Sequence, residues 1–233
     1  MNILITGATK GIGRAIAESL EGNIYAVARN ENLLKEQYQN YFVADLATID
    51  GMVNLGEFIK NNKIDVLINN AGEYIYAPIL EGFDTEKIEH ITRLNLEAPL
   101  YLISKAVSHM KSNGFGRIIN IGSISGVMGE ANASLYSATK AGLIGATKAL
   151  ALELAEYGIT VNTINPGWVD TDLGNSSITE SEFSKEEILD CIPQKRFVSP
   201  SEIAGMVKYL ISPEAKGVTG QSINLCAGLS VGY

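Results

Sequence analysis

Tyr136 and Lys140 stand four residues apart in a segment with a helical pattern, Ser134–Tyr157. Residues at this spacing share one face of a helix, so the phenol and the ammonium can lie close together. A nearby ammonium favours the phenolate and lowers the pKa of a tyrosine from about 10 toward the working pH, as efficient proton transfer requires. The pair therefore predicts an acid–base site, although such a pair more often lies on a solvated helix face.

Two further polar residues stand where an acid–base site could use them. Ser123 follows the apolar run Arg117–Gly122, which is typical of a buried strand, and a hydroxyl at the carboxyl end of a strand can hydrogen-bond a substrate carbonyl. Asn95 lies mid-helix between Leu94 and Leu96, where an asparagine costs helix propensity and so suggests a buried polar role. The alternatives are a strand-end cap for Ser123 and an ordinary buried amide for Asn95.

A glycine-rich turn follows the first apolar strand, with Gly7, Gly11 and Gly13 in the sequence TGATKGIGRA. Without Cβ atoms the backbone can turn sharply and approach a pyrophosphate, which then lies on the N-terminus of the next helix. The spacing differs from G-x-G-x-x-G, and no Gly-Lys-Ser/Thr ends it as in a P-loop. The turn predicts dinucleotide binding; the alternative is a turn that serves packing only.

The end of the second expected strand selects the dinucleotide. An NAD site places a carboxylate there to bind the ribose 2′-hydroxyl, but this chain has Ala28, Arg29 and Asn30. The Arg29 guanidinium suits a 2′-phosphate, and Lys10 in the glycine turn can add a second cation. We therefore expect NADP(H) rather than NAD(H), the alternative being that both are ordinary surface charges.

Short apolar segments alternate with longer helical patterns along the whole chain. The alternation predicts right-handed crossovers and an α/β Rossmann fold: a seven-stranded, doubly wound parallel sheet in a single domain, residues 1–233. Residues 172–199 are polar and irregular, which is typical of a substrate lid. The expected strands are Asn2–Thr6, Ile24–Ala28, Tyr41–Ala44, Val66–Asn69, Gly116–Ile121, Thr160–Asn165 and Ser222–Leu225, and the expected helices cover 12–20, 48–60, 84–110, 134–157 and 200–211.

Composition narrows the partners and the setting. The 18 basic and 26 acidic residues give a net charge of −8, which disfavours nucleic acid because its binding needs a basic face. Cys191 and Cys226 are the only cysteines, so we expect no metal site, no disulfide framework and a reducing, cytoplasmic setting. The run Ile3–Ile5 after Met1 indicates a strand rather than a signal peptide, and no apolar stretch approaches the ~18 residues that cross a membrane.

Together these motifs resemble the short-chain dehydrogenase/reductase family over the whole chain. The turn Thr6–Gly13 is similar to that family's cofactor turn, Asn69–Gly72 to its strand-four signature, and Asn165–Gly167 to the motif after strand six. The family's catalytic tetrad is matched by Asn95, Ser123, Tyr136 and Lys140.

The resemblance implies that a nicotinamide cofactor delivers hydride to a carbonyl carbon while Tyr136 protonates the oxygen. Lys140 would hold the nicotinamide ribose and lower the tyrosine pKa, Ser123 would orient the carbonyl, and Asn95 would anchor a relay water. The implied cofactor contacts are Gly7, Thr9, Lys10, Gly11, Ile12, Gly13, Arg29, Asp45, Leu46, Asn70, Ala71, Gly72, Tyr136, Lys140, Pro166, Gly167, Val169 and Thr171. From its position after a strand, Asp45 could instead be a strand-end cap.

Within the family, the chain most resembles bacterial 3-oxoacyl-(acyl-carrier-protein) reductases, in Gly116–Ser123 and Tyr136–Leu150 above all. This implies a 3-oxoacyl thioester substrate, with acyl carrier protein as a possible partner. Gly114 and Tyr157 stand where those reductases carry basic docking residues, with Lys111 and Arg117 the nearest cations, and a charge of −8 repels an acidic partner.

Other functions stay open on the sequence alone. They are reduction of another small ketone, oxidation of a sugar or hydroxysteroid, and a nucleotide sensor without turnover. A methyltransferase would have no use for the Tyr136 and Lys140 pair. The family also implies a homotetramer, or a homodimer, and the apolar second face of the Tyr136 helix is consistent with a buried interface or with burial within one chain.

Overall fold

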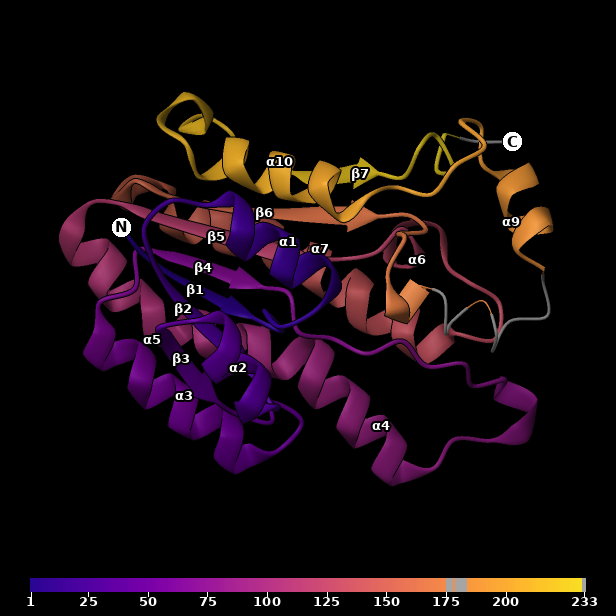
Figure 1. Ribbon diagram of the computed structural model, residues 1–233, viewed down its shortest axis with the longest axis horizontal. Helices are drawn as coiled ribbons and strands as arrows, with labels where there is room; N and C mark the ends of the chain where they lie inside the picture. The colour runs from indigo at the N-terminus through magenta and orange to yellow at the C-terminus, as the bar shows by residue number, and fades with distance from the viewer. Residues whose placement is uncertain (175–177, 179–183, 232–233) are drawn as a thin grey trace.

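The computed structural model describes residues 1–174, 178 and 184–231 of the chain. Seven parallel strands form one sheet in the order β3-β2-β1-β4-β5-β6-β7, so the chain winds outward from β1 in both directions (Figure 1). The predicted fold class is confirmed. The strands are β1 (Asn2–Thr6), β2 (Asn23–Ala28), β3 (Asn40–Val43), β4 (Val66–Asn69), β5 (Gly116–Ile121), β6 (Ile159–Pro166) and β7 (Ser222–Leu225).

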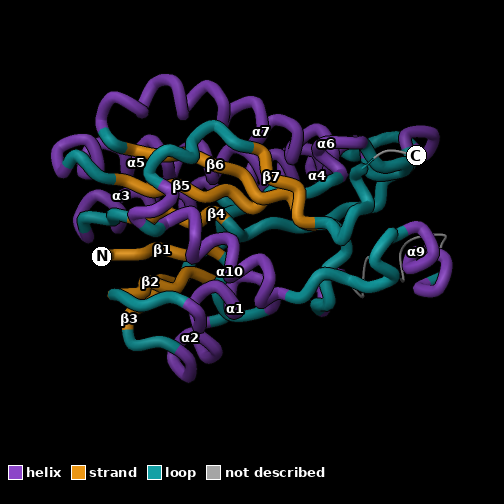
Figure 2. Tube along the Cα trace, turned by 90° about the horizontal axis from the view of Figure 1, so that it is seen from above, coloured by secondary structure: helices purple, strands orange, loops and turns teal. Residues whose placement is uncertain are grey.

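Helices cover both faces of this sheet, which is sandwiched between them in Figure 2. Four of the expected helices form close to their predicted bounds, and the fifth is divided. The helices are α1 (Gly11–Ser19), α2 (Glu31–Gln37), α3 (Ile49–Asn62), α4 (Thr85–Thr92), α5 (Ala98–Asn113), α6 (Ser125–Met128), α7 (Ser134–Leu154), α9 (Lys185–Cys191) and α10 (Pro200–Ile211). Short 3-10 turns lie at Ile79–Glu81, Ala155–Tyr157 and Pro213–Ala215.

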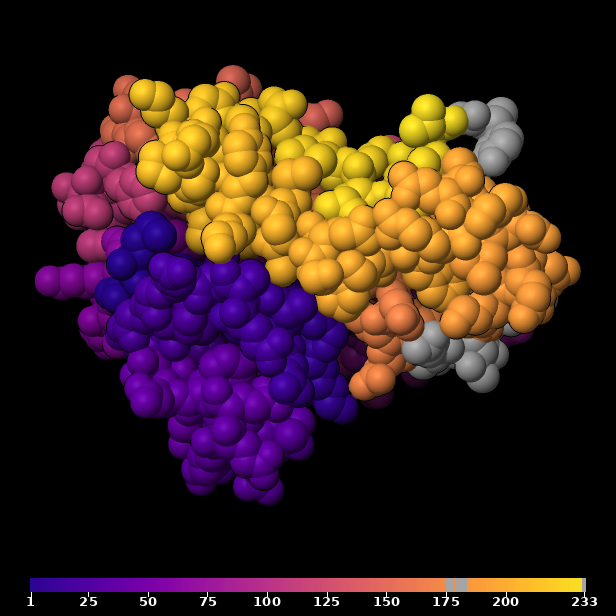
Figure 3. Space-filling model, turned by 45° about the horizontal axis from the view of Figure 1, so that its top comes forward, coloured from indigo at the N-terminus to yellow at the C-terminus, as the bar shows by residue number. Residues whose placement is uncertain are grey.

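Successive residues of β1 point to opposite faces and anchor two apolar cores. Ile3 and Ile5 lie with α1, α2 and α10, whereas Leu4 lies with α3, α5 and α7. All three side chains are fully buried, as the period-two geometry of a doubly covered strand requires. Figure 3 shows the outcome on one face, where C-terminal residues of α10 in gold lie against N-terminal residues of α1 in indigo.

The expected helix over residues 84–110 is divided into α4, a π-helical turn (Arg93–Glu97) and α5. A π turn inserts an extra residue and often marks a functional position. Here it carries Asn95, whose side chain bonds the backbone of Glu73 on a neighbouring loop. The periodicity of the sequence could not reveal the turn, because one added residue hardly disturbs an apolar stripe.

The segment 172–199 is not irregular throughout, as the sequence pattern had indicated, because α9 forms within it. A capping box starts α9, with the side chains of Ser184 and Glu187 each bonded to the other's backbone N–H. This is a sequence signature that could have placed the helix. Residues 175–177 and 179–183 of the predicted lid lie outside the described residues, and the lid function stays a prediction.

A row of buried polar side chains ties α7 to the sheet. Asn69 of β4 donates to Asn120 of β5 at 2.9 Å, Asn120 donates to Thr147 of α7 at 3.0 Å, and Thr147 lies 2.7 Å from Thr163 of β6. Each is at most 3% exposed, so none can exchange its partner for water. The row fixes where along the sheet α7 lies, and α7 carries Tyr136 and Lys140.

No helix of the described residues is long and apolar enough to cross a membrane. This extends to the helices the finding from the sequence that no apolar stretch has that length.

Replacing the hydroxyl at the centre of this row should weaken the fold. We expect Thr147→Val to lower the free energy of unfolding by about 1–3 kcal/mol, because it leaves buried groups of Asn120 and Thr163 without that partner. Thr160 of β6 is an equally buried control whose hydroxyl has no partner among the described residues, so Thr160→Val should be neutral or stabilising. Urea unfolding of both variants measures this, and an equal loss in the two would contradict the role of the row.

Candidate active site

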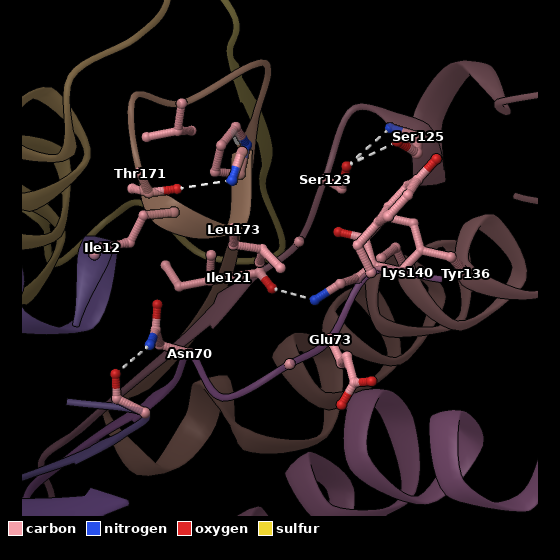
Figure 4. A pocket seen from close by; sticks show the side chains of 18 of the residues that line it. Ile12, Asn70, Glu73, Ile121, Ser123, Ser125, Tyr136, Lys140, Thr171 and Leu173 are labelled. Carbon is pink, nitrogen blue, oxygen red and sulfur yellow. Dashed lines mark hydrogen bonds between the residues drawn. The ribbon is translucent and has the colours of Figure 1, made fainter. Parts of the chain in front are cut away.

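One cavity of about 1490 Å³ opens along the carboxyl edge of the sheet. Apart from Gly13 and Asn95, every residue that the sequence predicted for catalysis or cofactor binding lines it. Gly13 lies beneath the glycine turn, and Asn95 is 1% exposed and reaches the cavity wall only through its neighbours. Figure 4 shows Ser123, Tyr136 and Lys140 on one side of the cavity and Ile12, Asn70 and Thr171 on the other.

Lys140 is buried in this wall, with 4% of its area exposed. Its Nζ donates to the carbonyl of Ile121 at the end of β5, at 3.0 Å, and lies 5.6 Å from the centre of the Tyr136 ring. Burial lowers the pKa of Lys140 to about 8, because an ammonium loses hydration there. The i, i+4 spacing therefore places a titratable amine beside the phenol as predicted.

Burial also raises the pKa of Tyr136 to about 12. The side chain keeps some area open to the cavity, but its surroundings are dense enough to disfavour a phenolate. The nearby Ser123 hydroxyl lowers this pKa and the Glu130 carboxylate raises it. The prediction that Lys140 lowers the tyrosine pKa is therefore wrong for the protein alone: desolvation is the larger effect, and the ammonium is directed at Ile121.

Asn95 bridges the π-helical turn and the loop after β4. Its Oδ1 accepts from the backbone N–H of Glu73 at 3.0 Å, and its Nδ2 donates to the Glu73 carbonyl at 2.9 Å. Gly72 lies between this amide and Lys140: a Cβ there would be 3.1 Å from Asn95 Oδ1 and 3.2 Å from Lys140 Nζ. The amide thus holds the backbone that closes the wall beside Lys140.

The glycine turn has the shape that close approach of a ligand requires. Gly7 and Gly11 have positive φ angles of +68° and +50°, and a Cβ on Gly13 would collide with the Gly7 carbonyl. Asn70 braces the turn from β4, since its Nδ2 donates to the carbonyls of Thr6 and Gly7 at 2.9 and 3.2 Å. No acidic side chain lies in the first turn of α1, so its N-terminal amides favour an anion.

The two predicted cations lie at the cavity mouth next to this turn. Lys10 and Arg29 are both exposed, and within the described ranges neither forms an ion pair with a carboxylate. Asp45 also lines the cavity, but its Oδ1 accepts from the backbone N–H of Ala47 at 3.0 Å. Its side chain therefore caps the end of β3, which was the alternative open on the sequence.

The other end of the cavity is closed by the segment after β6. Gly167 packs so closely on Cys226 that a Cβ would come within 2.8 Å of that side chain. Val169 bridges Val198, and Thr171 accepts from the backbone N–H of Gly174 at 3.1 Å. This backbone is held in place from both sides, so its amides and carbonyls form a fixed surface.

Sequence reasoning missed a polar group on the cavity wall between Ser123 and Tyr136. Ser125 donates to Glu130 at 2.6 Å, Tyr74 donates to the same carboxylate at 2.9 Å, and the Tyr74 ring lies edge-on to Tyr136 with 5.2 Å between centres. The signal was a carboxylate in the short stretch that joins two candidate catalytic residues. Among the described residues, no group of three or more potential ligands could hold a metal ion.

The family described as enoyl-(acyl carrier protein) reductase matches residues 7–230. An uncharacterized oxidoreductase of Bacillus subtilis, YxjF, is 37% identical, over 97% of this chain and 96% of that protein. The 3-oxoacyl-[acyl-carrier-protein] reductase FabG of Rickettsia felis is 36% identical, over 97% and 95%. A solved structure of actinorhodin polyketide ketoreductase with NADPH superimposes with a TM-score of 0.91 or less, namely 0.90, at 34% identity, over 98% and 96% of the two chains.

The fold and the cavity therefore define an oxidoreductase of the doubly wound α/β class. The chain belongs to the short-chain dehydrogenase/reductase family.

The buried ammonium gives a test of the site's energetics. Between pH 8 and the ordinary lysine pKa of 10.5, the unfolded chain holds a proton that the folded protein has lost, so the free energy of unfolding should rise with pH in this window. We expect Lys140→Met to be more stable than the native protein at pH 7, by about 1–3 kcal/mol after loss of the bond to Ile121, and to lack the rise. Urea unfolding at pH 7, 8 and 9 measures both. A less stable variant with an unchanged pH dependence would contradict the assignment.

Proposed function

We propose that this enzyme uses NADP(H) to interconvert a carbonyl compound and a secondary alcohol, with 3-oxoacyl thioesters as its substrate class. One observation carries the proposal: a single cavity joins the glycine turn at one end to Ser123, Tyr136 and Lys140 at the other. Such a cavity can hold a dinucleotide along its length and place a substrate beside an acid.

The residues at the phosphate end fit this cofactor. A collision at Gly13 and the positive φ angles of Gly7 and Gly11 leave the turn open to a pyrophosphate that a Cβ would exclude. Lys10 and Arg29 supply two cations without carboxylate partners in the described part of the chain, as a 2′-phosphate requires. The ketoreductase with NADPH supports the same choice.

The bound cofactor supplies a hydride to the carbonyl carbon, and the chain's own residues manage the proton. Ser123 hydrogen-bonds the carbonyl oxygen and holds it next to the phenol. Tyr136 gives its proton to that oxygen, which a phenol with a pKa of about 12 carries at any physiological pH. Lys140, with a pKa near 8, can return a proton to the site and offset the charge on Tyr136.

The thioester class is supported by the Rickettsia relative and by the actinorhodin ketoreductase, whose printed names specify acyl or polyketide substrates. Docking of acyl carrier protein gains no support from the two cations named for it. Arg117 is 4% exposed and bonds the carbonyls of Gly116 and Gly158, and Lys111 lies over the Tyr157 ring at 3.9 Å. We therefore propose a thioester substrate whose carrier need not be that protein.

Assembly and setting remain proposals. The outer face of α7 exposes Leu152, 85% accessible, beside small residues such as Ala141 and Gly145, and an apolar helix face of this kind favours a homodimer or homotetramer in a cytoplasmic enzyme. Light scattering on the purified protein would determine the number of subunits.

The proton donor is tested by removing one atom. Tyr136→Phe should lower kcat for NADPH-dependent reduction of an acetoacetyl thioester by at least ~100-fold, because the ring remains but its proton is lost. Fluorescence titration should find NADPH affinity within a few fold of the native value. A variant that keeps most of its kcat would exclude Tyr136 as the acid.

The same assay separates the alternatives. Turnover of a simple ketone, a sugar or a hydroxysteroid in place of the thioester would identify another substrate class. Tight NADPH binding without oxidation by any of these carbonyls would indicate a nucleotide sensor.

Cofactor preference is tested at the mouth of the cavity. Arg29→Asp should lower kcat/KM for NADPH by at least ~10-fold and raise it for NADH, since a carboxylate repels the 2′-phosphate and can accept from a 2′-hydroxyl. Arg14→Gln is the matched control, because Arg14 pairs with Glu18 on the exposed side of α1 and does not line the cavity. A native enzyme that prefers NADH would refute the assignment.

A further inference from the structure

We propose that Glu130 is a positioning residue: acting through Ser125 and Tyr74, its carboxylate holds the reacting proton on Tyr136. The inference rests on the proposed function, because it assigns a task to a group next to the proton donor. It concerns a residue that lies in the loop between α6 and α7, on the wall of the cavity.

Glu130 has polar partners but no cation. Its Oε2 accepts from Ser125 at 2.6 Å and its Oε1 accepts from Tyr74 at 2.9 Å. Within the described ranges no Lys, Arg or His forms an ion pair with it, whereas the other cavity-wall carboxylate near this end, Glu73, lies 3.2 Å from His90. An unpaired carboxylate held by two short hydrogen bonds is costly to place beside a reacting centre, so a chemical task is the better explanation.

A carboxylate can only accept hydrogen bonds, and this fixes the direction of the whole chain. The single proton of Ser125 must go to Glu130, so the Ser125 oxygen can only accept from Ser123, which lies 3.0 Å away. The Ser123 oxygen in turn accepts from the backbone N–H of Ser125 at 3.1 Å. The proton of Ser123 therefore points toward Ser125 and away from the phenol.

This direction favours the protonated form of Tyr136. A phenolate would need Ser123 to turn its proton toward it, which breaks the bond that Ser123 donates to Ser125. The negative charge of Glu130 acts in the same sense and raises the pKa of Tyr136. Two independent effects, the direction of the hydrogen bonds and the charge, thus oppose loss of the proton.

Tyr74 links the carboxylate to the other side of the phenol. Its hydroxyl donates to Glu130 and its ring packs edge-on against the Tyr136 ring. The groups that face Tyr136 are then Lys140 from α7, Ser123 after β5, Tyr74 after β4 and Glu130 before α7. The remaining titratable groups on the cavity wall nearby are the pair Glu73 and His90, and Glu187, Asp190 and Cys191 of α9.

The test titrates Tyr136 directly and needs no turnover. The ultraviolet absorbance of tyrosinate is followed against pH, and the curve for each protein is corrected with that of the same protein carrying Tyr136→Phe. We expect Glu130→Gln to move the ionisation of Tyr136 about one pH unit or more toward neutral pH. Ser125→Ala should move it in the same direction by less, and the double variant by less than the sum of the two shifts.

The exposed carboxylate Glu156, next to the end of α7 and outside the cavity, is the control, and Glu156→Gln should leave the titration unchanged. An unchanged or more basic ionisation of Tyr136 in Glu130→Gln would overturn the proposal. So would additive shifts in the double variant, because Glu130 would then not act through Ser125.

A kinetic readout accompanies the titration if the enzyme reduces acetoacetyl thioester with NADPH. In Glu130→Gln, the fall of the reduction rate at high pH and the rise of the oxidation rate with pH should both move to lower pH by the same amount, which loss of folding alone cannot produce. Absence of turnover in the native enzyme would count against the proposed substrate and leave the titration result standing.

Discussion

The position of α7 on the sheet is the constraint on which the site depends. The buried row from Asn69 through Asn120 and Thr147 to Thr163 can satisfy its hydrogen bonds in one register only, and a shift of α7 along the sheet would leave several polar groups buried without partners. That register places the ammonium of Lys140 at the carbonyl of Ile121 and the phenol of Tyr136 beside Ser123. Catalytic geometry is thus fixed from below, by groups that never contact a ligand.

Burial does two opposite things at this site. It pushes protons off the amine of Lys140 and keeps them on the phenol of Tyr136, so the two groups carry complementary tasks near neutral pH. The arrangement costs stability, since an apolar side chain at position 140 would pack without that desolvation, and the enzyme retains it because the chemistry needs it. Bound cofactor and substrate complete the electrostatics that the protein alone leaves unbalanced.

Much of this could be predicted from the sequence. The strands β1, β4, β5 and β7 have the predicted bounds, because parallel strands covered on both faces are apolar nearly throughout. The tetrad and the glycine turn were found because their chemistry depends on local spacing. The pKa of Tyr136 was predicted with the wrong sign, because desolvation depends on what other segments bring to the phenol. Glu130 was missed because its role arises only when Ser125 and Tyr74 meet it in space.

A crystal structure of the complex with NADP⁺ would test the central claim, that one cavity brings the dinucleotide and Tyr136 together. The nicotinamide ring is expected beside Tyr136, with its ribose in hydrogen-bond reach of Lys140 and the 2′-phosphate between Lys10 and Arg29. A nicotinamide ring directed away from Tyr136, or a dinucleotide bound outside the cavity, would contradict the proposed chemistry.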